Sequence, residues 1–414
     1  MPENLSKWIE ENLLIQNYKK KSLDGYKKSL DGYKEVLNSL NLNKPKEIIL
    51  IGGTNGKGSL SELITKLALK QNISVGTFTS PHLLNFNERI KVNDKEISDE
   101  KLLDVLKRFN QYKESHDLNF YQIISLAALD YFNKLDLDLW ILEIGMGGRL
   151  DPMNFIEPDI SVITKVALDH QEYLGDTIED IAAEKVEIAR PNRPLIFGSE
   201  NVPNSIIEKI SKINSFLISP EKNKYSFNEL SKKSTLSKEV LFCLNEVSKT
   251  SIFDFSCEIT KKFLDNFKIF GRLTSFDNFL VDSAHNEDSV RNLVIYLDSN
   301  FKGKKINLFF ACSENKDPIK LLKPFEGIVD KIYLADNIHQ KLMSSKKILL
   351  KTKTLNFDFA VKDSMKDLYS IAEEKNINEL NLFVGSFYFS GEIFKYLLKS
   401  KNLPISISSL REVI

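Results

Sequence analysis

Residues 46–60, KEIILIGGTNGKGSL, decide the fold of this chain. A run of aliphatic residues ends abruptly in two glycines, and Gly-Lys-Gly-Ser follows after two further residues. The residues after that serine carry apolar side chains at three- and four-residue spacing, which predicts a helix. A buried strand that enters a helix through a glycine-rich turn is typical of a phosphate-binding loop, because backbone N–H groups converge there.

The loop departs from the common phosphate-binding pattern G-x-x-x-x-G-K-[ST] in two respects. Ile51 occupies the leading position, and Gly58 separates Lys57 from Ser59. We expect the backbone amides of residues 54–58 to surround an anion, Lys57 to place its charge on the outer phosphates, and Ser59 to offer a hydroxyl to Mg²⁺. The alternative is a strand–helix turn that binds nothing, but a lysine directly before Gly-Ser favours a phosphate site.

Apolar strand-like runs and helical patterns alternate along the rest of the chain. The first series of predicted strands is 47–53, 73–82, 137–151, 159–170 and 193–199. The second series is 278–286, 305–317, 331–337 and 380–394. Continuous apolar strands between helices favour a doubly wound, mostly parallel sheet. We therefore predict an α/β fold with two domains, 1–273 and 274–414, of which the second is smaller and Rossmann-like.

The heptapeptide KSLDGYK occurs at 21–27 and again, unchanged, at 28–34. Its leucines and tyrosines recur at helical spacing, so we predict one helix through both copies. The duplication is too short for a repeat architecture and is interpreted as extra helical turns. Residues 200–270 are mostly polar, and the pattern there predicts one further helix at about 236–248.

Composition restricts the possible partners. Lys plus Arg and Asp plus Glu each number 57 in 414 residues, so no overall basic field favours nucleic acid or an anionic membrane. No apolar run approaches membrane-spanning length, and the first residues lack the apolar core of a signal peptide. The three cysteines lack metal-site spacing. We expect a cytoplasmic protein with small-molecule ligands, and a monomer.

Polar and glycine-rich segments follow four of the predicted strands: GGTNGKGS, TSPH, EIGMGGRLD and ALDH. Ligands of open parallel sheets bind at the carboxyl ends of the strands, so we expect the site there. Glu143 supplies a carboxylate of the kind that Mg²⁺ prefers, and His170 is a less usual ligand. A histidine considered alone is more often a hydrogen-bonded structural residue. The expected presence of Ser59 and Glu143 at the same strand ends favours His170 as a metal ligand instead.

Lys185 lies in the segment DIAAEKVEIAR, at the border of an apolar helical stripe. On that pattern alone a solvated or snorkelling lysine is favoured. A partly desolvated lysine would instead have a lowered pKa and could capture CO₂ as a carbamate. The sequence pattern leaves both alternatives open.

Six motifs occur in order: GGTNGKGS, TSPHL, LEIGMGGRLD, ALDHQEYLGDTIEDIAAEK, FGR and DSAHN. With them the chain resembles the folylpolyglutamate synthase/dihydrofolate synthase family of the Mur ligase superfamily. The correspondence covers about residues 46–190, resumes at 270–290, and includes 316–317 and 385–392. GTNGKGS alone would fit any Mur-type ligase, whereas EIGMGGRLD followed by LDH and AAEK is specific to the folate branch.

The resemblance implies a Mur-ligase-type ATPase domain that binds ATP and two Mg²⁺ ions. The nucleotide contacts that it implies are Thr54, Asn55, Gly56, Lys57, Gly58, Ser59, Arg272 and Asp282. The implied metal ligands are Ser80, Glu143, His170 and Lys185, the last as a carbamate that bridges to the second ion. The implied catalytic residues are Lys57, Lys185 and His285, and the implied folate-pocket residues are Asn119, Gln122, Leu150, Asp151 and Pro152.

Two positions depart from the family pattern. The family's pterin-binding T-x-F-E is NFYQ at 119–122, so Gln122 replaces a carboxylate that could pair with the pterin in a charge-assisted, bidentate manner. The family's nucleotide-contacting Asn in Q-x-x-N-x-x-x-A has no counterpart at 236–243, LSKEVLFC.

The family reaction is ATP-dependent ligation of L-glutamate to a folate or dihydropteroate carboxylate through an acyl phosphate, in folate biosynthesis and one-carbon metabolism. A Mur-type peptide ligase is one alternative, although only about 45 residues precede the phosphate loop. A P-loop ATPase that is not a ligase and a silent folate-binding relative are the others. The sequence does not distinguish dihydropteroate from reduced folate as the acceptor.

Overall fold

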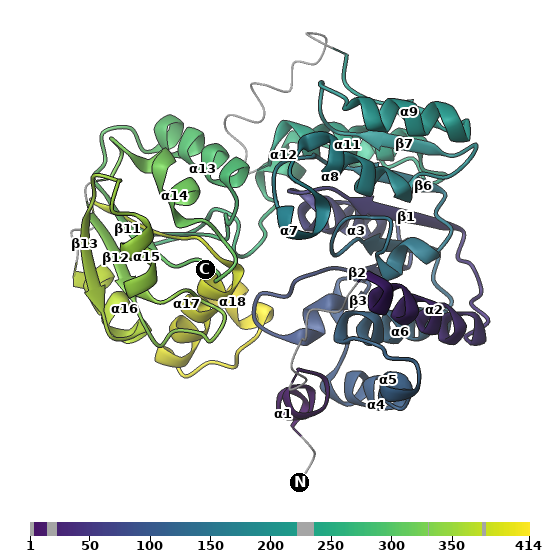
Figure 1. The fold of residues 1–414 in the computed structure, drawn as a ribbon, viewed down its shortest axis with the longest axis horizontal. Helices are drawn as coiled ribbons and strands as arrows, with labels where there is room; N and C mark the ends of the chain where they lie inside the picture. The colour runs from purple at the N-terminus through teal and green to yellow at the C-terminus, as the bar shows by residue number, and fades with distance from the viewer. Residues whose placement is uncertain (1–3, 15–22, 222–235, 330, 375–377) are drawn as a thin grey trace. The chain divides into compact units, whose positions relative to one another are not determined.

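The computed structural model describes residues 4–14, 23–221, 236–329, 331–374 and 378–414 (Figure 1). These residues form two compact units. Unit 1 contains the described residues up to His82 and from Phe86 to Asp265, and unit 2 contains Leu83–Asn85 and Asn266–Ile414. The domain division at residues 273 and 274 stays a prediction.

The described part of unit 1 contains an eight-stranded sheet in the order β4-β3-β2-β5-β1-β6-β7-β8. Its strands are β1 Glu47–Gly52, β2 Val75–Phe78, β3 Ile90–Val92, β4 Lys95–Glu96, β5 Leu139–Glu143, β6 Ile160–Ile163, β7 Pro194–Phe197 and β8 Phe216–Ile218. Neighbours from β2 to β8 in this order pair in parallel, which confirms the predicted mostly parallel sheet. The antiparallel edge of β3 and β4 was not predicted, because both strands are short and their turn at Asn93 and Asp94 interrupts the pattern.

Helices surround this sheet (Figure 1). They are α1 Leu5–Ile9, α2 Leu23–Ser39, α3 Lys57–Lys70, α4 Asp99–Asn110, α5 Tyr112–Ser115, α6 Phe120–Asn133, α7 Gln171–Leu174, α8 Ile178–Lys185, α9 Asn204–Ile213, α11 Lys238–Thr250 and α12 Lys261–Asp265. The described part of the unit also contains a π-helix, η1 Glu10–Leu14, and the 3₁₀ helices η2 Phe86–Arg89, η3 Pro152–Phe155, η4 Val186–Ile188 and η5 Ser256–Glu258. The helix predicted at 236–248 is confirmed as α11.

The central strand β1 is buried along its whole length. Ile48 and Leu50 belong to a core that includes residues of α6 and α8. The alternate residues Ile49 and Ile51 face the other side of the strand, where α3 packs against β1 and α11 packs against α3. This two-sided burial is the reason that β1 is continuously apolar, and it fixes the phosphate loop at the carboxyl edge of the sheet.

The described part of unit 2 contains a six-stranded sheet in the order β13-β12-β11-β14-β10-β9. Its strands are β9 Thr274–Phe276, β10 Phe279–Asp282, β11 Ile306–Phe310, β12 Lys331–Ala335, β13 Asp358–Lys362 and β14 Leu380–Val384. Its helices are α13 Glu287–Asn300, α14 Pro318–Leu322, η6 Lys323–Phe325, α15 Ser345–Lys351, α16 Met365–Glu374, α17 Phe387–Ser400 and α18 Ile407–Val413. All strand pairs are parallel except β9 with β10.

Both faces of the unit 2 sheet are covered. Leu280, Leu308 and Leu382 belong to one buried core, and Phe309 and Phe383, which alternate with two of them, belong to another. The predicted Rossmann-like second domain is therefore confirmed in its architecture. The edge strands β9 and β13 were not predicted, because β13 is only half-buried and β9 is three residues long.

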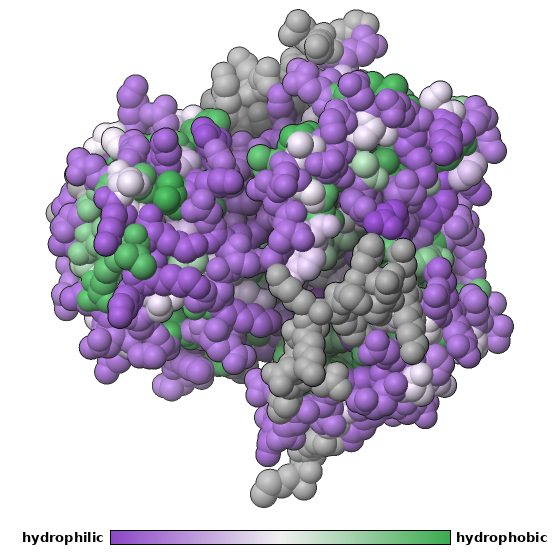
Figure 2. Space-filling view, viewed as in Figure 1, coloured by the Kyte–Doolittle hydropathy of each residue, from purple (hydrophilic) through white to green (hydrophobic). Residues whose placement is uncertain are grey.

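The duplicated heptapeptide forms part of one helix, as predicted. α2 begins at Leu23 and runs through the second copy, while residues 21 and 22 lie outside the described residues. Tyr33 and Leu37 are buried on its inner face. No described helix combines the length and the apolar composition that a membrane span requires. In the view of Figure 2 hydrophilic residues predominate, and hydrophobic residues form small separate patches.

Candidate active site

The phosphate loop is held in a conformation that requires glycine at two positions. Gly53 follows β1 with a φ of 133°, and Gly56 precedes α3 with a φ of 91°. A Cβ on Gly53 would overlap the Thr164 hydroxyl, and a Cβ on Gly56 would lie 2.6 Å from Cγ2 of Val240. Thr164 and Val240 therefore pack against the backbone of a glycine loop that leads directly into α3, an arrangement that fits a phosphate ligand at the helix N-terminus.

Residues at the carboxyl end of β6 brace this loop. The Thr164 hydroxyl donates to the carbonyl of Asn55 at 2.7 Å, and the amide of Thr54 donates to the carbonyl of Lys165 at 2.7 Å. The Thr54 hydroxyl donates to the carbonyl of Ala167 at 3.2 Å. The loop is thus preorganised by its neighbours, as a rigid anion site needs to be.

Lys57 and Lys185 converge on this loop. Nζ of Lys57 and Nζ of Lys185 each lie 3.1 Å from the carbonyl oxygen of Gly53 and donate to it. Lys185 is the last residue of α8 and is 4% exposed, so the alternative of a solvated surface lysine is wrong. Burial and the charge of Lys57 lower the pKa of Lys185 to about 7, against the opposing attraction of Asp169 and Asp151.

Glu143 and Ser80 lie together beside the start of α3. Glu143 is buried at the end of β5, and its Oε2 accepts from the amide of Ser80 at 3.2 Å. The same Oε2 lies 3.6 Å from the position that a Cβ would occupy on Gly58. The hydroxyl of Tyr121 lies 3.5 Å from the carbonyl oxygen of Glu143. Burial raises the pKa of Tyr121 well above its ordinary value. Tyr121 was not singled out from the sequence.

His170 is the N-cap residue of α7 and has a φ of 50°. Its amide donates to Asp169 Oδ1 at 2.8 Å, and its side chain is 38% exposed. Among the described residues, no group of three or more His, Cys, Asp and Glu side chains has the geometry of a metal site. Carboxylate, hydroxyl and imidazole groups nevertheless suit Mg²⁺, which keeps several waters and takes substrate phosphates as ligands. The metal roles of Ser59, Ser80, Glu143 and His170 stay a prediction.

The second glycine loop ends at Asp151, which caps η3. Asp151 Oδ2 accepts from the amides of Gly145 and Met146 at 2.9 and 3.2 Å, and Oδ1 accepts from the amide of Met153 at 2.9 Å. Burial raises the pKa of Asp151 to about 7, although these three hydrogen bonds and Lys57 oppose the shift. The flanking Leu150 is half-buried and Pro152 is buried. The carboxylate therefore fixes the shape of this loop.

Asn119 and Gln122 form a capping box at the start of α6. Oε1 of Gln122 accepts from the amide of Asn119 at 2.8 Å and from the hydroxyl of Ser29 at 2.8 Å. Gln122 is fully buried, and its Nε2 has no hydrogen-bond partner among the described residues. The pterin contact expected of Gln122 stays a prediction.

The link from Gln122 to α2 could not be predicted, because Ser29 lies 93 residues away in the sequence. One turn after Ser29, the hydroxyl of Tyr33 is also buried without a partner in the described part of the chain. Burial and the charge of Asp151 raise the pKa of Tyr33 well above its ordinary value. The second copy of the heptapeptide thus places two polar groups against the predicted folate pocket.

In unit 2, Arg272, Asp282 and His285 gather near the start of α17. Asp282 accepts from the amides of Leu273 and Ala284, each at 2.8 Å. Burial raises the pKa of Asp282, and Arg272 opposes this shift. The Arg272 guanidinium lies 4.9 Å and the His285 ring 5.4 Å from the ring centroid of Phe387. The roles predicted for these residues toward the nucleotide and the reaction stay predictions.

Residues 51–261 match the model of the Mur ligase middle domain. The chain is 30% identical over 311 residues to the dihydrofolate synthase/folylpolyglutamate synthase of Buchnera aphidicola from Acyrthosiphon pisum, which covers 70% of this chain and 73% of that one. It is 38% identical over 166 residues to the Haemophilus influenzae protein of the same name, a match that spans 40% of this chain and 38% of the relative.

The fold is also that of a solved structure. The bifunctional folylpolyglutamate synthase/dihydrofolate synthase of Yersinia pestis, complexed with AMPPNP and Mn ion, superposes with a TM-score of 0.79 at 21% identity. The superposition covers 97% of this chain and 99% of that chain. At this identity the likeness bears on the fold alone, and it confirms the predicted α/β architecture.

Proposed function

The chain belongs to the dihydrofolate synthase/folylpolyglutamate synthase family, and on that premise we propose that it joins L-glutamate to a carboxylate of a folate or of dihydropteroate with ATP as phosphoryl donor. In the first step a carboxylate oxygen of the acceptor attacks the γ-phosphorus, and ADP leaves. In the second step the glutamate amine attacks the acyl carbon, an amide forms, and inorganic phosphate leaves. Such chemistry needs positioning and charge neutralisation more than covalent help from the protein.

The observation that carries this proposal is the convergence of Lys57 and Lys185 on the Gly53 carbonyl. The Lys57 ammonium beside a glycine cradle suits a ligand with several negative charges, such as a triphosphate, and the buried Lys185 places a reactive amine at the same loop. We assign Lys57 to the outer phosphates, with the amides of residues 55–58 around them. A divalent cation bound by Ser80, Glu143 and His170 would neutralise the phosphate charge further.

We further propose that Lys185 carries a carbamate. The neutral amine attacks CO₂, an N–C bond forms, and one proton is released to solvent. A pKa of about 7 leaves a large neutral fraction of this amine near neutral pH, and the Lys57 ammonium would stabilise the product's negative charge. The resulting carboxylate would be an additional ligand for a second divalent cation.

For the acceptor we propose the segment around Asp151, with Leu150 and Pro152, and the start of α6 with Asn119 and Gln122. The buried Asp151 supports this assignment, since both of its oxygens shape the loop that lies between Glu143 and α8. Arg272, Asp282 and His285 are proposed to serve the nucleotide and the reaction. We propose that the enzyme acts as a cytoplasmic monomer on small molecules.

Phosphate release from Mg-ATP tests the function. The purified protein is assayed with dihydropteroate or with tetrahydrofolate, each with and without L-glutamate, and products are identified by mass. We expect release that requires both an acceptor and glutamate. Release with both acceptors would establish a bifunctional ligase. Release with tetrahydrofolate alone would indicate that Gln122, in place of the family's carboxylate, prevents the use of dihydropteroate. Release that ignores acceptor and glutamate would indicate an ATPase, and absence of release would indicate a silent relative.

A further inference from the structure

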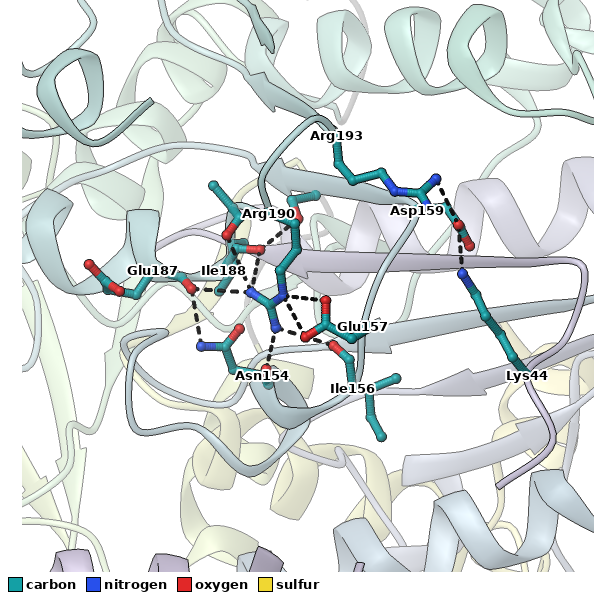
Figure 3. A network of polar contacts seen from close by, with 11 residues as sticks. Lys44, Asn154, Ile156, Glu157, Asp159, Glu187, Ile188, Arg190 and Arg193 are labelled. Atoms are coloured by element: carbon teal, nitrogen blue, oxygen red, sulfur yellow. Dashed lines mark hydrogen bonds and ion pairs between the residues drawn. The ribbon is translucent and has the colours of Figure 1, made fainter. Parts of the chain in front are cut away.

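The segments that follow Asp151 and Lys185 in the chain lie against each other (Figure 3). The segment after Asp151 comprises η3 and the chain to Glu157, and the segment after Lys185 comprises η4 and Ala189. Asn154 Nδ2 donates to the carbonyl of Glu187 at 3.2 Å and joins them directly. The relative placement of the acceptor side and the phosphate side within unit 1 therefore depends on this junction.

Arg190 holds the junction from its centre (Figure 3). Its Nη1 donates to three consecutive carbonyls of the Lys185 side, those of Glu187, Ile188 and Ala189, at 3.3, 3.1 and 3.4 Å. Its Nη2 donates to the carbonyls of Asn154 and, at 3.3 Å, Ile156 on the Asp151 side. Its Nε donates to both carboxylate oxygens of Glu157 at 3.1 and 3.0 Å.

The hydrogen bonds from Arg190 to backbone carbonyls stabilise the junction more than its ion pair with Glu157 does. The Glu157 side chain is 75% exposed, and exposed ion pairs contribute little to stability. The Arg190 side chain is only 13% exposed, and its planar fork satisfies carbonyls at the ends of two 3₁₀ helices at once. A lysine offers three N–H donors on a single nitrogen, so it cannot replace the contacts that the three guanidinium nitrogens make.

A second link closes the other end of the junction. The amide of Arg149 donates to the carbonyl of Glu184 at 3.0 Å, and the Arg149 guanidinium donates to the Glu184 carboxylate at 3.0 and 2.8 Å. A Cβ on Gly148 would lie 2.6 Å from the Glu184 carbonyl oxygen, so the glycine loop and the end of α8 are in close contact. With both ends joined, movement of one segment displaces the other.

We propose that Arg190 is a positioning residue that fixes Asp151, and with it the acceptor pocket, relative to Lys185 and the phosphate loop. This inference rests on the proposed function, because it assigns Asp151 to the acceptor side and Lys185 to the phosphate side. Without Arg190, the acceptor carboxylate is misplaced relative to the γ-phosphate while the phosphate cradle itself is intact. Loss of Arg190 should therefore change the acceptor KM or kcat far more than the KM for ATP.

The test uses Arg190→Lys and Arg190→Ala in the full chain, with Arg193→Ala as control. Arg193 lies three residues on; its side chain pairs with Asp159 at 3.2 Å and is 50% exposed. We expect both Arg190 variants to raise the acceptor KM or lower kcat by about tenfold or more, with a change in the ATP KM of less than about twofold. Arg193→Ala should match the wild type in all three constants.

Hydrogen–deuterium exchange supplies a readout that does not need activity. In Arg190→Lys we expect faster exchange at 145–156 and 184–189 and unchanged exchange at 53–60. If Arg190→Ala does not fold, Arg190→Lys alone decides both measurements. Unchanged acceptor constants and unchanged exchange at the junction would overturn the proposal, as would equal losses toward acceptor and ATP. An inactive wild type would contradict the proposed function instead, and the exchange data would still decide whether Arg190 holds the junction.

Discussion

Lys57 and Lys185 donate to the same acceptor, the carbonyl oxygen of Gly53, from nitrogens that each lie 3.1 Å from it. One lysine begins α3, and the other ends α8. Burial, and after it the charge of Lys57, lower the pKa of Lys185. The relationship therefore divides the roles: Lys57 remains the cation for phosphate, and Lys185 becomes the amine that can react.

The carbamate predicts a dependence of activity on CO₂. Lys185→Ala should lower kcat by about a hundredfold or more, since it removes a charged group from a preorganised site. Wild-type activity should fall in buffer freed of CO₂ and return when bicarbonate is added. Short carboxylic acids should restore part of the activity of Lys185→Ala. Steady-state assays in degassed buffer measure all three effects, and full activity without CO₂ would exclude the carbamate.

The lowered pKa of Lys185 predicts a pH dependence of stability. Between its folded value of about 7 and the ordinary 10.5, the unfolded chain binds a proton that the folded chain does not. The folded state therefore gains stability relative to the unfolded state as pH rises through this window. Lys185→Met should lack this gain, so the wild type should become more stable relative to the variant from about pH 7 to about pH 9.

Urea unfolding in CO₂-free buffer measures this difference. The comparison starts at pH 7 because the raised pKa of Asp151, also about 7, makes the opposite contribution below that value. A stability difference between wild type and Lys185→Met that does not vary with pH would show that the amine is not desolvated.

Gly56→Ala tests the fit of the phosphate cradle. The new methyl would lie 2.6 Å from Val240 Cγ2, at a φ of 91° that disfavours alanine. We expect a loss of roughly 1–3 kcal/mol of unfolding free energy and a rise of about tenfold or more in the ATP dissociation constant. Gly303→Ala is the matched control, because its φ is 80° and no atom lies within 4 Å of the added Cβ. Calorimetric titration with a non-hydrolysable ATP analogue should show unchanged binding in the control.

Removal of the Ser29 hydroxyl and removal of the Tyr33 hydroxyl should have different effects on stability, although the two residues lie on one face of α2. Ser29→Ala removes a buried hydrogen bond to Gln122 and should destabilise the protein by about 1 kcal/mol or more. Tyr33→Phe removes a hydroxyl that has no partner among the described residues, so it should be neutral or stabilising. Thermal unfolding checks both. A clear loss of stability in Tyr33→Phe would indicate a bound water or another partner at that hydroxyl.

The phosphate loop and the central strands could be predicted because their signals are local. Consecutive apolar residues define β1, and the glycines that follow it allow positive φ. The edge strands β3, β4, β8, β9 and β13 escaped prediction because short, partly exposed strands carry little hydrophobic pattern.

The contacts that give the candidate site its electrostatics are not local. Lys185 lies 132 residues from the carbonyl to which it donates, so its burial could not be inferred from the stripe on its own helix. The same holds for Arg190, whose partners on the Asp151 side lie 34 and 36 residues away. Sequence patterns indicate which face of a helix is apolar, but packing decides which charged side chain is enclosed.

The central claim is that the acceptor carboxylate attacks the γ-phosphate of ATP, and an oxygen-18 label in that carboxylate tests it most directly. The acceptor is prepared with oxygen-18 in its carboxylate and incubated with the enzyme, Mg-ATP and L-glutamate. Attack of the carboxylate on the γ-phosphate and release of phosphate from the acyl carbon must carry one labelled oxygen into inorganic phosphate. We predict that mass spectrometry finds one oxygen-18 in each phosphate released. Unlabelled phosphate would show that water attacks ATP directly, and it would contradict ligation through an acyl phosphate.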